Sequence, residues 1–90
     1  MKDSIIRLSP PTLPRWILDQ LPESVIRYIV EISGRQFHVM EVGSGTPVLA
    51  LHGNPTWSFL YRRVMQRLLG RPVRVITPDL LGLGFSERIP

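Results

Sequence analysis

The feature that most constrains the fold is an uninterrupted apolar run at residues 48–51, Val-Leu-Ala-Leu, followed at once by the turn sequence of residues 52–56. Such runs are typical of strands buried on both faces, as in a parallel sheet covered by helices. Beyond the turn, apolar residues recur at helical spacing, so we expect an amphipathic helix over residues 56–69. A short strand is predicted at residues 73–77, and the three elements make one right-handed βαβ unit.

A β-hairpin is predicted before this unit. Residues 25–32 are mostly β-branched or aromatic, Ser33 and Gly34 form a turn signal, and residues 35–42 give a second strand. Prolines interrupt residues 1–24, which predicts an irregular N-terminal arm with a helical turn near Trp16.

The predicted fold class is α/β, with the β-hairpin and the βαβ unit in one sheet. Residues 25–90 form the core of this arrangement, and residues 1–24 form the arm. Four strands and one clear helix are too few layers to cover both faces of the apolar run at residues 48–51. We therefore expect the sheet to be incomplete as it stands.

Composition excludes several classes of protein. A length of 90 residues allows one domain at most, and a hydrophobic share of 43% is typical of a globular chain. The absence of cysteine excludes a disulfide scaffold, a cysteine nucleophile and a thiolate metal site, with the cytoplasm as the default location. No apolar run approaches the roughly 18–20 residues that span a bilayer, so no membrane association is expected.

Nucleic-acid, metal and cofactor sites have little support. The net charge of +4 comes largely from arginines, five of them within residues 62–74, which we interpret as a solvated helix face. The two histidines, His38 and His52, lack carboxylates at metal-ligand spacing. The glycines of residues 82–84 lack the third glycine of a dinucleotide fingerprint, and the single lysine, Lys2, leaves no P-loop. We expect no metal, no organic cofactor and no nucleic-acid partner.

The informative segment is the passage from the apolar strand through the turn into the helix. Ligands of open α/β sheets bind at the carboxyl ends of such strands. Backbone N–H groups at a helix start lack intrahelical partners, so they can stabilise a negatively charged oxygen there. An acyl-transfer or ester-forming enzyme needs a site of this kind.

Two motifs then carry a specific resemblance. Residues 52–62, His-Gly-Asn-Pro-Thr-Trp-Ser-Phe-Leu-Tyr-Arg, resemble the oxyanion-hole segment of α/β-hydrolases, and within them of haloalkane dehalogenases. Residues 79–86, Asp-Leu-Leu-Gly-Leu-Gly-Phe-Ser, resemble the loop after the next strand of that family, and the hairpin over residues 25–42 fits its first two strands. The resemblance covers residues 25–88. Epoxide hydrolases and β-lactone decarboxylases share close variants of both motifs.

The resemblance implies one site residue. The backbone N–H of Asn54 would be one arm of the oxyanion hole, and its side-chain amide would help to hold a departing halide. A neutral amide suits that role, because it stabilises an anion without adding a charge that traps it. From the residues alone, capping of the helix that follows is the favoured role of Asn54.

Other residues near the motifs are expected to be structural. Trp57 shares a helical face with apolar residues, so we expect it to pack in the core. His52 is expected to shape the turn and not to act as the catalytic base, which the family places near its C-terminus. Asp79 is expected to satisfy backbone donors in its own loop. Three glycines are interpreted as residues that allow backbone conformations which other residues rarely adopt: Gly53, Gly82 and Gly84.

The catalytic residues of the family are absent from the 90 residues. No Gly-x-Ser-x-Gly or Gly-x-Asp-x-Gly nucleophile elbow occurs, and the acid, the base and the cap domain are missing as well. In the family's strand order, the strand at residues 73–77 inserts between the second strand and the third. The run at residues 48–51 would then expect the nucleophile-bearing strand on its other side, and without that strand it would leave an apolar edge unpaired.

The resemblance implies that the whole protein is a haloalkane dehalogenase-like hydrolase. A carboxylate would displace halide from a small apolar haloalkane-like substrate, and a histidine-activated water would hydrolyse the alkyl-enzyme ester. The 90-residue chain would supply only Asn54 and would be inactive alone.

Three alternatives remain open. One is a β-lactone decarboxylase or epoxide hydrolase of the same fold. Another is a non-catalytic truncated product, or a subunit that needs a complementing C-terminal segment or chain. The third is an arginine-mediated nucleic-acid binder, which would lose affinity steeply with salt.

Overall fold

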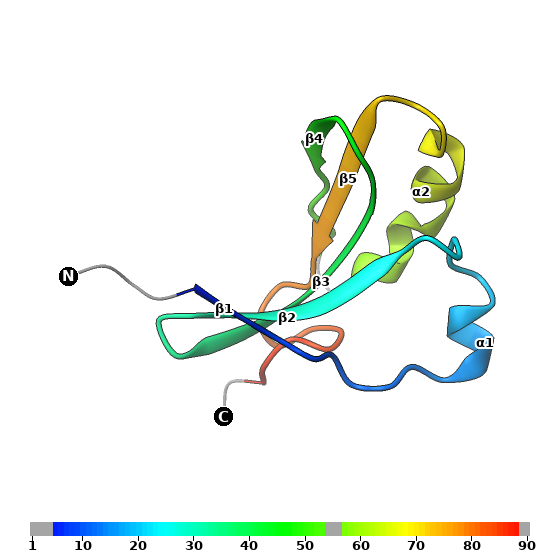
Figure 1. The fold of residues 1–90 in the computed structure, drawn as a ribbon. Coiled ribbons are helices and arrows are strands. Elements are labelled where there is room, and N and C mark those ends of the chain that lie inside the picture. Colours follow the sequence, from blue (N-terminus) through cyan, green and yellow to red (C-terminus); the bar gives the residue numbers. More distant parts are fainter. Residues whose placement is uncertain (1–4, 54–56, 89–90) are drawn as a thin grey trace.

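The computed structural model describes residues 5–53 and 57–88. Within them the chain forms one five-stranded sheet with spatial order β1-β2-β3-β5-β4 (Figure 1). The strands are β1 (Ile5–Leu8), β2 (Ile26–Ile32), β3 (Arg35–Gly43), β4 (Thr46–Leu49) and β5 (Val73–Pro78). Strand β5 lies between β3 and β4, parallel to β4 and antiparallel to β3, as the family's strand order predicts.

The β2–β3 hairpin confirms the sequence prediction. Its register runs from Ile26 opposite Glu41 to Ile32 opposite Arg35. The two turn residues, Ser33 and Gly34, both have positive φ, 50° and 79°. That conformation is typical of the tight turns whose twist matches the twist of paired strands.

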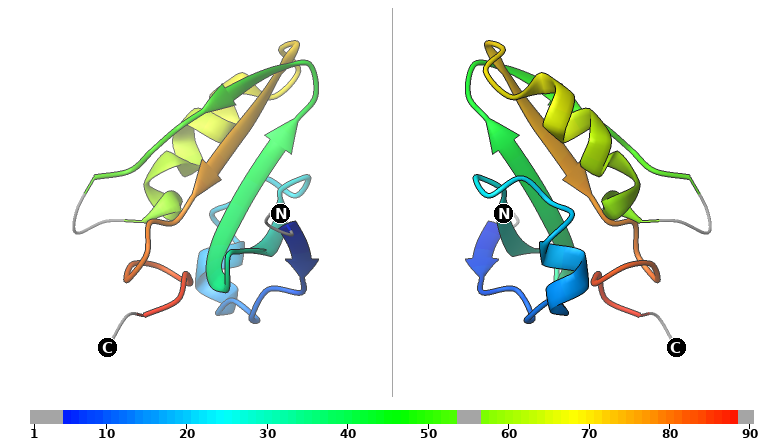
Figure 2. Two further views of the ribbon diagram at one scale, coloured as in Figure 1. Left: turned by 90° about the vertical axis from the view of Figure 1, so that its left-hand side faces the viewer. Right: turned by 90° about the vertical axis from the view of Figure 1, so that its right-hand side faces the viewer.

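Three helical segments lie on one face of the sheet (Figure 2). They are α1 (Arg15–Leu18), the 3₁₀ turn η1 (Ser58–Tyr61) and α2 (Arg62–Leu68). The predicted helix at residues 56–69 therefore starts with a tighter turn and is shorter than expected. No helix among the described residues has the length and apolar content to cross a bilayer.

The core lies between this face and the helical segments. Met40, Val42 and Val75 of the sheet pack with Met65 of α2. The arm adds the remaining buried side chains of the core, Leu13, Ile17 and Leu21. The arm is thus more regular than predicted, because it contains β1, paired antiparallel with β2, in addition to the expected helical turn α1.

The connection from β3 to β4 crosses close to the start of β5. Gly43 and Gly45 have φ of 90° and 116°, and a Cβ on either would clash with the backbone of β5 or of the residue before it. The N–H of Thr46 donates to the carbonyl of Pro72 over 3.0 Å. Glycine is required at these two positions, because a side chain would force the strands apart.

Strand β4 lies at the edge of the described sheet. It begins and ends two residues earlier than predicted, and all four of its residues are exposed. Leu49 is 63% exposed and Leu51, just beyond the strand, is 55% exposed. The predicted apolar edge is therefore present.

Candidate functional site

The predicted site is the turn between β4 and η1. Asn54, the predicted oxyanion- and halide-binding residue, lies outside the described residues, as do residues 55 and 56. The residues on either side of it are described. They show how the chain positions the two ends of this turn.

His52 anchors the near end of the turn. Its side chain is buried, and its Nε2 accepts a hydrogen bond of 2.9 Å from the N–H of Leu80. Nε2 therefore carries no proton, and the ring donates from Nδ1 to the carbonyl of Gly53 over 2.7 Å. Both ring nitrogens of a neutral imidazole are used, which confirms that His52 shapes the turn.

Tyr61 provides a second anchor. Its hydroxyl, at the end of η1, donates to the carbonyl of Leu51. The chain leading into the turn is thus tied to the helical layer by Tyr61 and to the loop after β5 by His52.

The loop after β5 is organised by Asp79, which is fully buried. Its Oδ1 accepts a hydrogen bond of 2.6 Å from the N–H of Ser58, at the start of η1. Its Oδ2 accepts from the N–H of Phe85 over 3.0 Å and faces Nδ1 of His38 at 2.8 Å. The expectation that Asp79 satisfies backbone donors is confirmed, and the donors include one outside its own loop.

These hydrogen bonds decide the ionisation of Asp79. Burial raises the pKa of its carboxyl, whereas the hydrogen bonds from His38, Phe85 and Ser58 lower it. The hydrogen bonds prevail, and the pKa of Asp79 lies below its ordinary value. The carboxylate is therefore ionised and holds the far end of the turn through Ser58.

His38 connects Asp79 to Arg27. Nε of Arg27 donates to Nε2 of His38 over 3.1 Å, so His38 carries its proton on Nδ1 and donates to Asp79. A second nitrogen of Arg27 donates to the carbonyl of Pro11 over 2.7 Å. Burial lowers the pKa of Arg27, and the charge of Asp79 partly offsets this.

This Arg27–His38–Asp79 chain was not predicted from the sequence. His38 and Asp79 are 41 residues apart, and they meet because β3 pairs with β5 in a register that places Val39 opposite Pro78. The strand order alone could have indicated that the two residues lie near each other, because β3 and β5 are neighbours. The register was needed to bring the two side chains together.

The rest of the loop closes around Asp79. The hydroxyl of Ser86 donates to the carbonyl of Asp79 over 2.6 Å and accepts from the N–H of His38 over 2.8 Å. Gly84 has φ of 54°, and a Cβ there would collide with the Asp79 carboxylate. Gly82 also has positive φ, so both loop glycines adopt a backbone conformation that other residues rarely adopt, as expected. Gly53 does not have positive φ, so that interpretation is wrong for Gly53.

Trp57 and Phe59 form an aromatic group with Phe85. The ring of Trp57 stacks on Phe59 with centroids 5.3 Å apart and meets Phe85 edge-on at 5.4 Å. Both residues pack against the core, as expected for Trp57. Thr77 Oγ1 is buried without a hydrogen-bond partner among the described residues.

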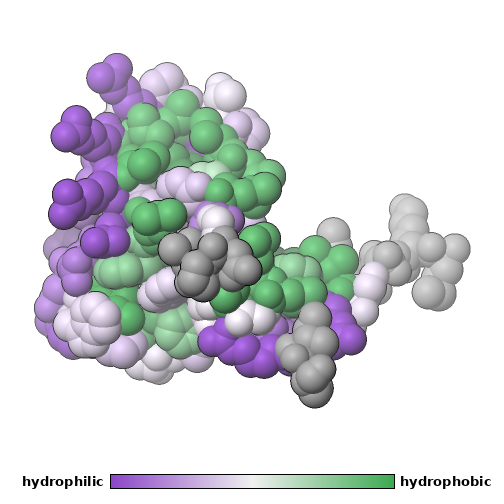
Figure 3. Space-filling model, turned by 180° about the vertical axis from the view of Figure 1, so that it is seen from behind, coloured by the Kyte–Doolittle hydropathy of each residue, from purple (hydrophilic) through white to green (hydrophobic). Residues whose placement is uncertain are grey.

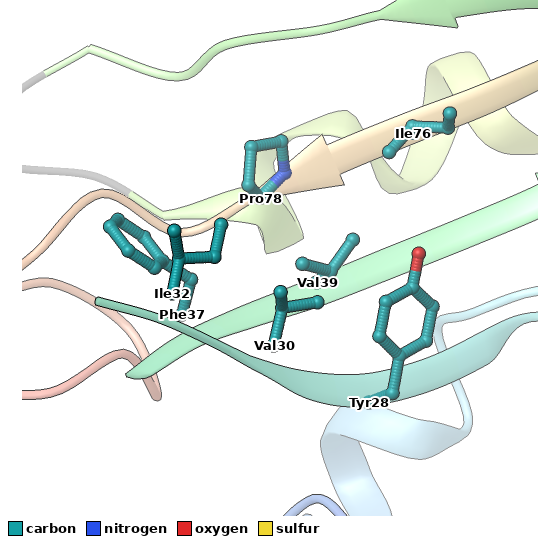
Figure 4. Close-up of a pocket in the computed structure, with 7 residues that line it drawn as sticks. All are labelled: Tyr28, Val30, Ile32, Phe37, Val39, Ile76 and Pro78. Carbon is teal, nitrogen blue, oxygen red and sulfur yellow. The ribbon is translucent and has the colours of Figure 1, made fainter. Parts of the chain in front are cut away.

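No helical segment of the described residues covers the opposite face of the sheet, and much of that face is apolar. A shallow hollow of about 360 Å³ lies there, lined by side chains of β2, β3 and β5 (Figure 4). At its rim the hydroxyl of Tyr28 donates to Glu41, which also accepts from Arg74 at 3.0 and 3.1 Å. Its lining includes Val39 and Ile76, which alternate with the core residues Met40 and Val75, so the hollow lies on the face of the sheet opposite the helical layer.

The described residues therefore provide a scaffold and no free acid or base. They contain no group of three or more histidine or acidic side chains that could hold a metal ion. Each titratable group next to the turn is occupied by an internal partner: His52 by Leu80 and Gly53, and Asp79 by His38 and two backbone N–H groups. What the arrangement can do is hold the described ends of the turn, His52 and Gly53 on one side and Ser58 on the other.

The sequence relatives of the chain are haloalkane dehalogenases. Haloalkane dehalogenase 2 of Mycobacterium tuberculosis is 51% identical over 53 residues, which are 59% of this chain and 18% of the relative. The haloalkane dehalogenase of Agrobacterium fabrum is 46% identical over 61 residues, which are 68% of this chain and 20% of the relative. The chain thus spans about a fifth of the length of the curated relatives it matches. No family model matches it.

Solved structures share the fold. The haloalkane dehalogenase DatA of Agrobacterium tumefaciens superposes with a TM-score of 0.73 at 39% identity, over 79% of this chain and 24% of that one. An epoxide hydrolase of Vigna radiata superposes with a TM-score of 0.70 at 37% identity, over 76% of this chain and 22% of that one. The chain forms part of an α/β-hydrolase sheet.

This partial α/β-hydrolase sheet corresponds to the N-terminal part of its relatives. Its two parallel strands, β4 and β5, end at the same edge. The turn with His52 and the loop with Asp79 therefore lie side by side at the carboxyl ends of the strands, where ligands of such sheets bind.

Proposed function

We propose that the chain is the N-terminal part of a haloalkane dehalogenase-like hydrolase, in which it supplies the oxyanion- and halide-binding arm at Asn54. The observation that carries the proposal is the identity of up to 51% with haloalkane dehalogenases. In this proposal residues 25–90 belong to the catalytic core, and residues 1–24 are an arm packed on it.

In the proposed reaction the nucleophile, the acid and the base come from outside the 90 residues. A carboxylate displaces halide from a small apolar haloalkane-like substrate, and water then hydrolyses the alkyl-enzyme ester. Asn54 donates hydrogen bonds to the developing negative charge. The anchored ends of the turn support this role, because a donor lowers a barrier most when its position is fixed before the reaction.

The neutral state of His52 supports the same proposal. A positive charge beside the turn would bind the released halide tightly and slow its departure. The ring of His52 is held as the neutral tautomer by Leu80 and Gly53, so it adds no net charge beside Asn54.

Epoxide hydrolysis is the second candidate activity. The epoxide hydrolase of Vigna radiata has nearly the same TM-score as the dehalogenase DatA. An epoxide opens without releasing a separate anion, so the side-chain amide of Asn54 would have no halide to hold. The two reactions therefore differ in what they require of that side chain.

The test is a chimaera in which the 61 matched residues of this chain replace the corresponding segment of the Agrobacterium fabrum relative. We expect it to release halide from a short bromoalkane. Asn54→Ala should lower kcat by about 10²–10³-fold, the usual cost of losing one oxyanion donor. Gln66→Ala, at an exposed position of α2, is the matched control and should leave kcat unchanged.

The outcomes separate the candidate functions. Hydrolysis of an epoxide without halide release would favour the second activity. A folded chimaera with neither activity would contradict both. The 90-residue chain alone should release no halide, because it contains no nucleophile elbow.

A further inference from the structure

Arg27 of β2 lies in surroundings unlike those of the arginines on α2. Figure 3 views the molecule from behind Figure 1 and shows hydrophilic residues gathered along one side, where Figure 1 places α2. Arg63 and Arg67 of α2 are exposed. Arg27 is half-buried instead, and its guanidinium donates to Nε2 of His38 over 3.1 Å and to the carbonyl of Pro11 over 2.7 Å. Its position indicates a role beyond solubility.

A buried negative charge lies on the other side of His38. Burial raises the pKa of the Asp79 carboxyl, yet hydrogen bonds hold it below its ordinary value, so the fully buried group is ionised. A buried charge is costly unless an opposite charge or hydrogen bonds compensate it. Among the described residues no arginine forms a direct ion pair with this carboxylate. The nearest positive charge along the hydrogen-bond chain is that of Arg27, one imidazole ring away.

The imidazole of His38 connects the two charges. Arg27 can only donate, so Nε2 of His38 accepts, and Nδ1 then donates to Asp79 over 2.8 Å. Burial lowers the pKa of Arg27 and the charge of Asp79 raises it, so the two charged groups interact across the ring. The three side chains are therefore arranged as a cation, a neutral bridge and an anion.

The second oxygen of Asp79 leads to the proposed site. Its Oδ1 accepts a hydrogen bond of 2.6 Å from the N–H of Ser58, which follows Asn54 closely in the sequence. Hydrogen bonds to an ionised acceptor are roughly twice as strong as neutral ones. A protonated Asp79 would donate from one oxygen and could no longer accept at both. Whatever keeps this carboxylate ionised therefore also holds the far end of the turn.

We propose that Arg27 is a positioning residue for the oxyanion-binding turn. It supplies the counter-charge of the buried Asp79 across the ring of His38, and so holds the far end of the turn at Ser58. The arm takes part, because the carbonyl of Pro11 accepts from the same guanidinium. The inference rests on the proposed function and deepens it, since it gives β2 and the arm a part in holding the turn.

The variants separate the charge of Arg27 from its bulk. Packing is the alternative role, because the guanidinium also lies over the ring of Phe85, 5.9 Å from its centroid. Arg27→Met keeps a long side chain without the charge, and Arg27→Lys keeps the charge and one donor. Arg27→Gln keeps a donor without the charge, should behave like Arg27→Met, and replaces it if that variant does not fold. Arg35→Met is the matched control, since Arg35 also ties the hairpin to the loop after β5, but through Glu87 instead of His38.

Hydrogen exchange in the 90-residue chain tests the arrangement without any activity. In Arg27→Met the amide of Ser58 should exchange at least about tenfold faster, because its acceptor is weakened. The amide of Leu80 is the internal reference, since it lies in the neighbouring loop but donates to His52, and its exchange should stay the same. Arg27→Lys and Arg35→Met should match the unmodified chain at both amides.

Turnover tests the consequence for the reaction. The chimaera for this test carries all 90 residues, including the arm, followed by the part of the Agrobacterium fabrum relative that lies beyond its matched segment. Arg27→Met should lower kcat for a short bromoalkane by about 10–100-fold, because a small misplacement of a catalytic group is costly. It should leave KM within about twofold, because the turn acts on the transition state. Arg27→Lys should recover most of the loss, and Arg35→Met should cause none.

The results separate this inference from the proposed function. If the unmodified chimaera releases halide and Arg27→Met turns over equally fast, the inference is wrong and the proposed function stands. If the unmodified chimaera releases no halide, the proposed function fails, and the exchange of the Ser58 amide still decides whether Arg27 holds the turn. Unchanged exchange at Ser58 in Arg27→Met would overturn that role. Equally faster exchange in Arg27→Met and Arg27→Lys, at Ser58 and Leu80 alike, would assign Arg27 to packing and overturn the counter-charge.

Discussion

Strands β5 and β4 lie side by side and parallel, yet they end in very different surroundings. Strand β5 is paired on both sides, and the loop after it closes on the buried Asp79. Strand β4 is paired on one side in the described sheet and fully exposed, and the chain beyond it is held by hydrogen bonds from Ala50, His52 and Tyr61. The comparison shows that stability is concentrated on the β5 side, while the proposed chemistry lies on the β4 side.

Among the changes that test this comparison, removing the carboxylate of Asp79 should lower the free energy of unfolding most. In Asp79→Ala, the N–H groups of Ser58 and Phe85 and the ring of His38 lose their shared acceptor in a buried place. We expect a loss of about 3–5 kcal/mol in the free energy of unfolding, measured by urea denaturation. Asp79→Asn keeps one acceptor oxygen and should lose less. A loss below about 1 kcal/mol for the alanine variant would show that the hydrogen bonds of Asp79 do not stabilise the loop.

Truncating one side chain on each strand should change the free energy of unfolding by smaller amounts. Val75 of β5 is 1% exposed, whereas Leu49 of β4 is 63% exposed. Val75→Ala should cost about 2 kcal/mol through the cavity it leaves, and Leu49→Ala less than about 0.5 kcal/mol. The measurement is urea unfolding of dilute protein. Equal losses would mean that the β4 edge is covered in solution.

Acid should produce the smallest of these effects. The folded pKa of Asp79 lies below its unfolded value of 3.8, so its contribution is complete above that value and is lost as the pH falls through the folded pKa. We expect the urea midpoint to decline from about pH 5 downward and Asp79→Asn to flatten that decline. An unchanged slope in the variant would assign the acid sensitivity to Glu41 and Glu87, whose pKa values are also lowered.

Much of the fold could be predicted from the sequence, because its signals are local. The hairpin follows from β-branched runs around Ser33 and Gly34, and β5 from the short run at residues 73–77. Strand β1 was missed because its four residues stand just before a run of prolines and take their structure from pairing with β2. The shift of β4 has a similar cause, since its start is fixed by the bond from Thr46 to Pro72.

The candidate site could be predicted only in part. His52 and Asp79 could be predicted as structural residues, because both stand in turn motifs whose backbone groups need hydrogen-bond partners. The contribution of His38 depends on a pairing register between strands that are distant in sequence, and no local pattern encodes it. The assignment of Asn54 stays a prediction.

The insertion of β5 between β3 and β4 also sets an order of events during synthesis. Strand β4 leaves the ribosome before the only described strand that pairs with it. Residues 50–72 must be made first, which takes roughly 1–5 s at about 5–20 residues per second. For that interval the apolar run at residues 48–51 has none of the described strands to join, so β4 can pair only after residues 73–78 have been made.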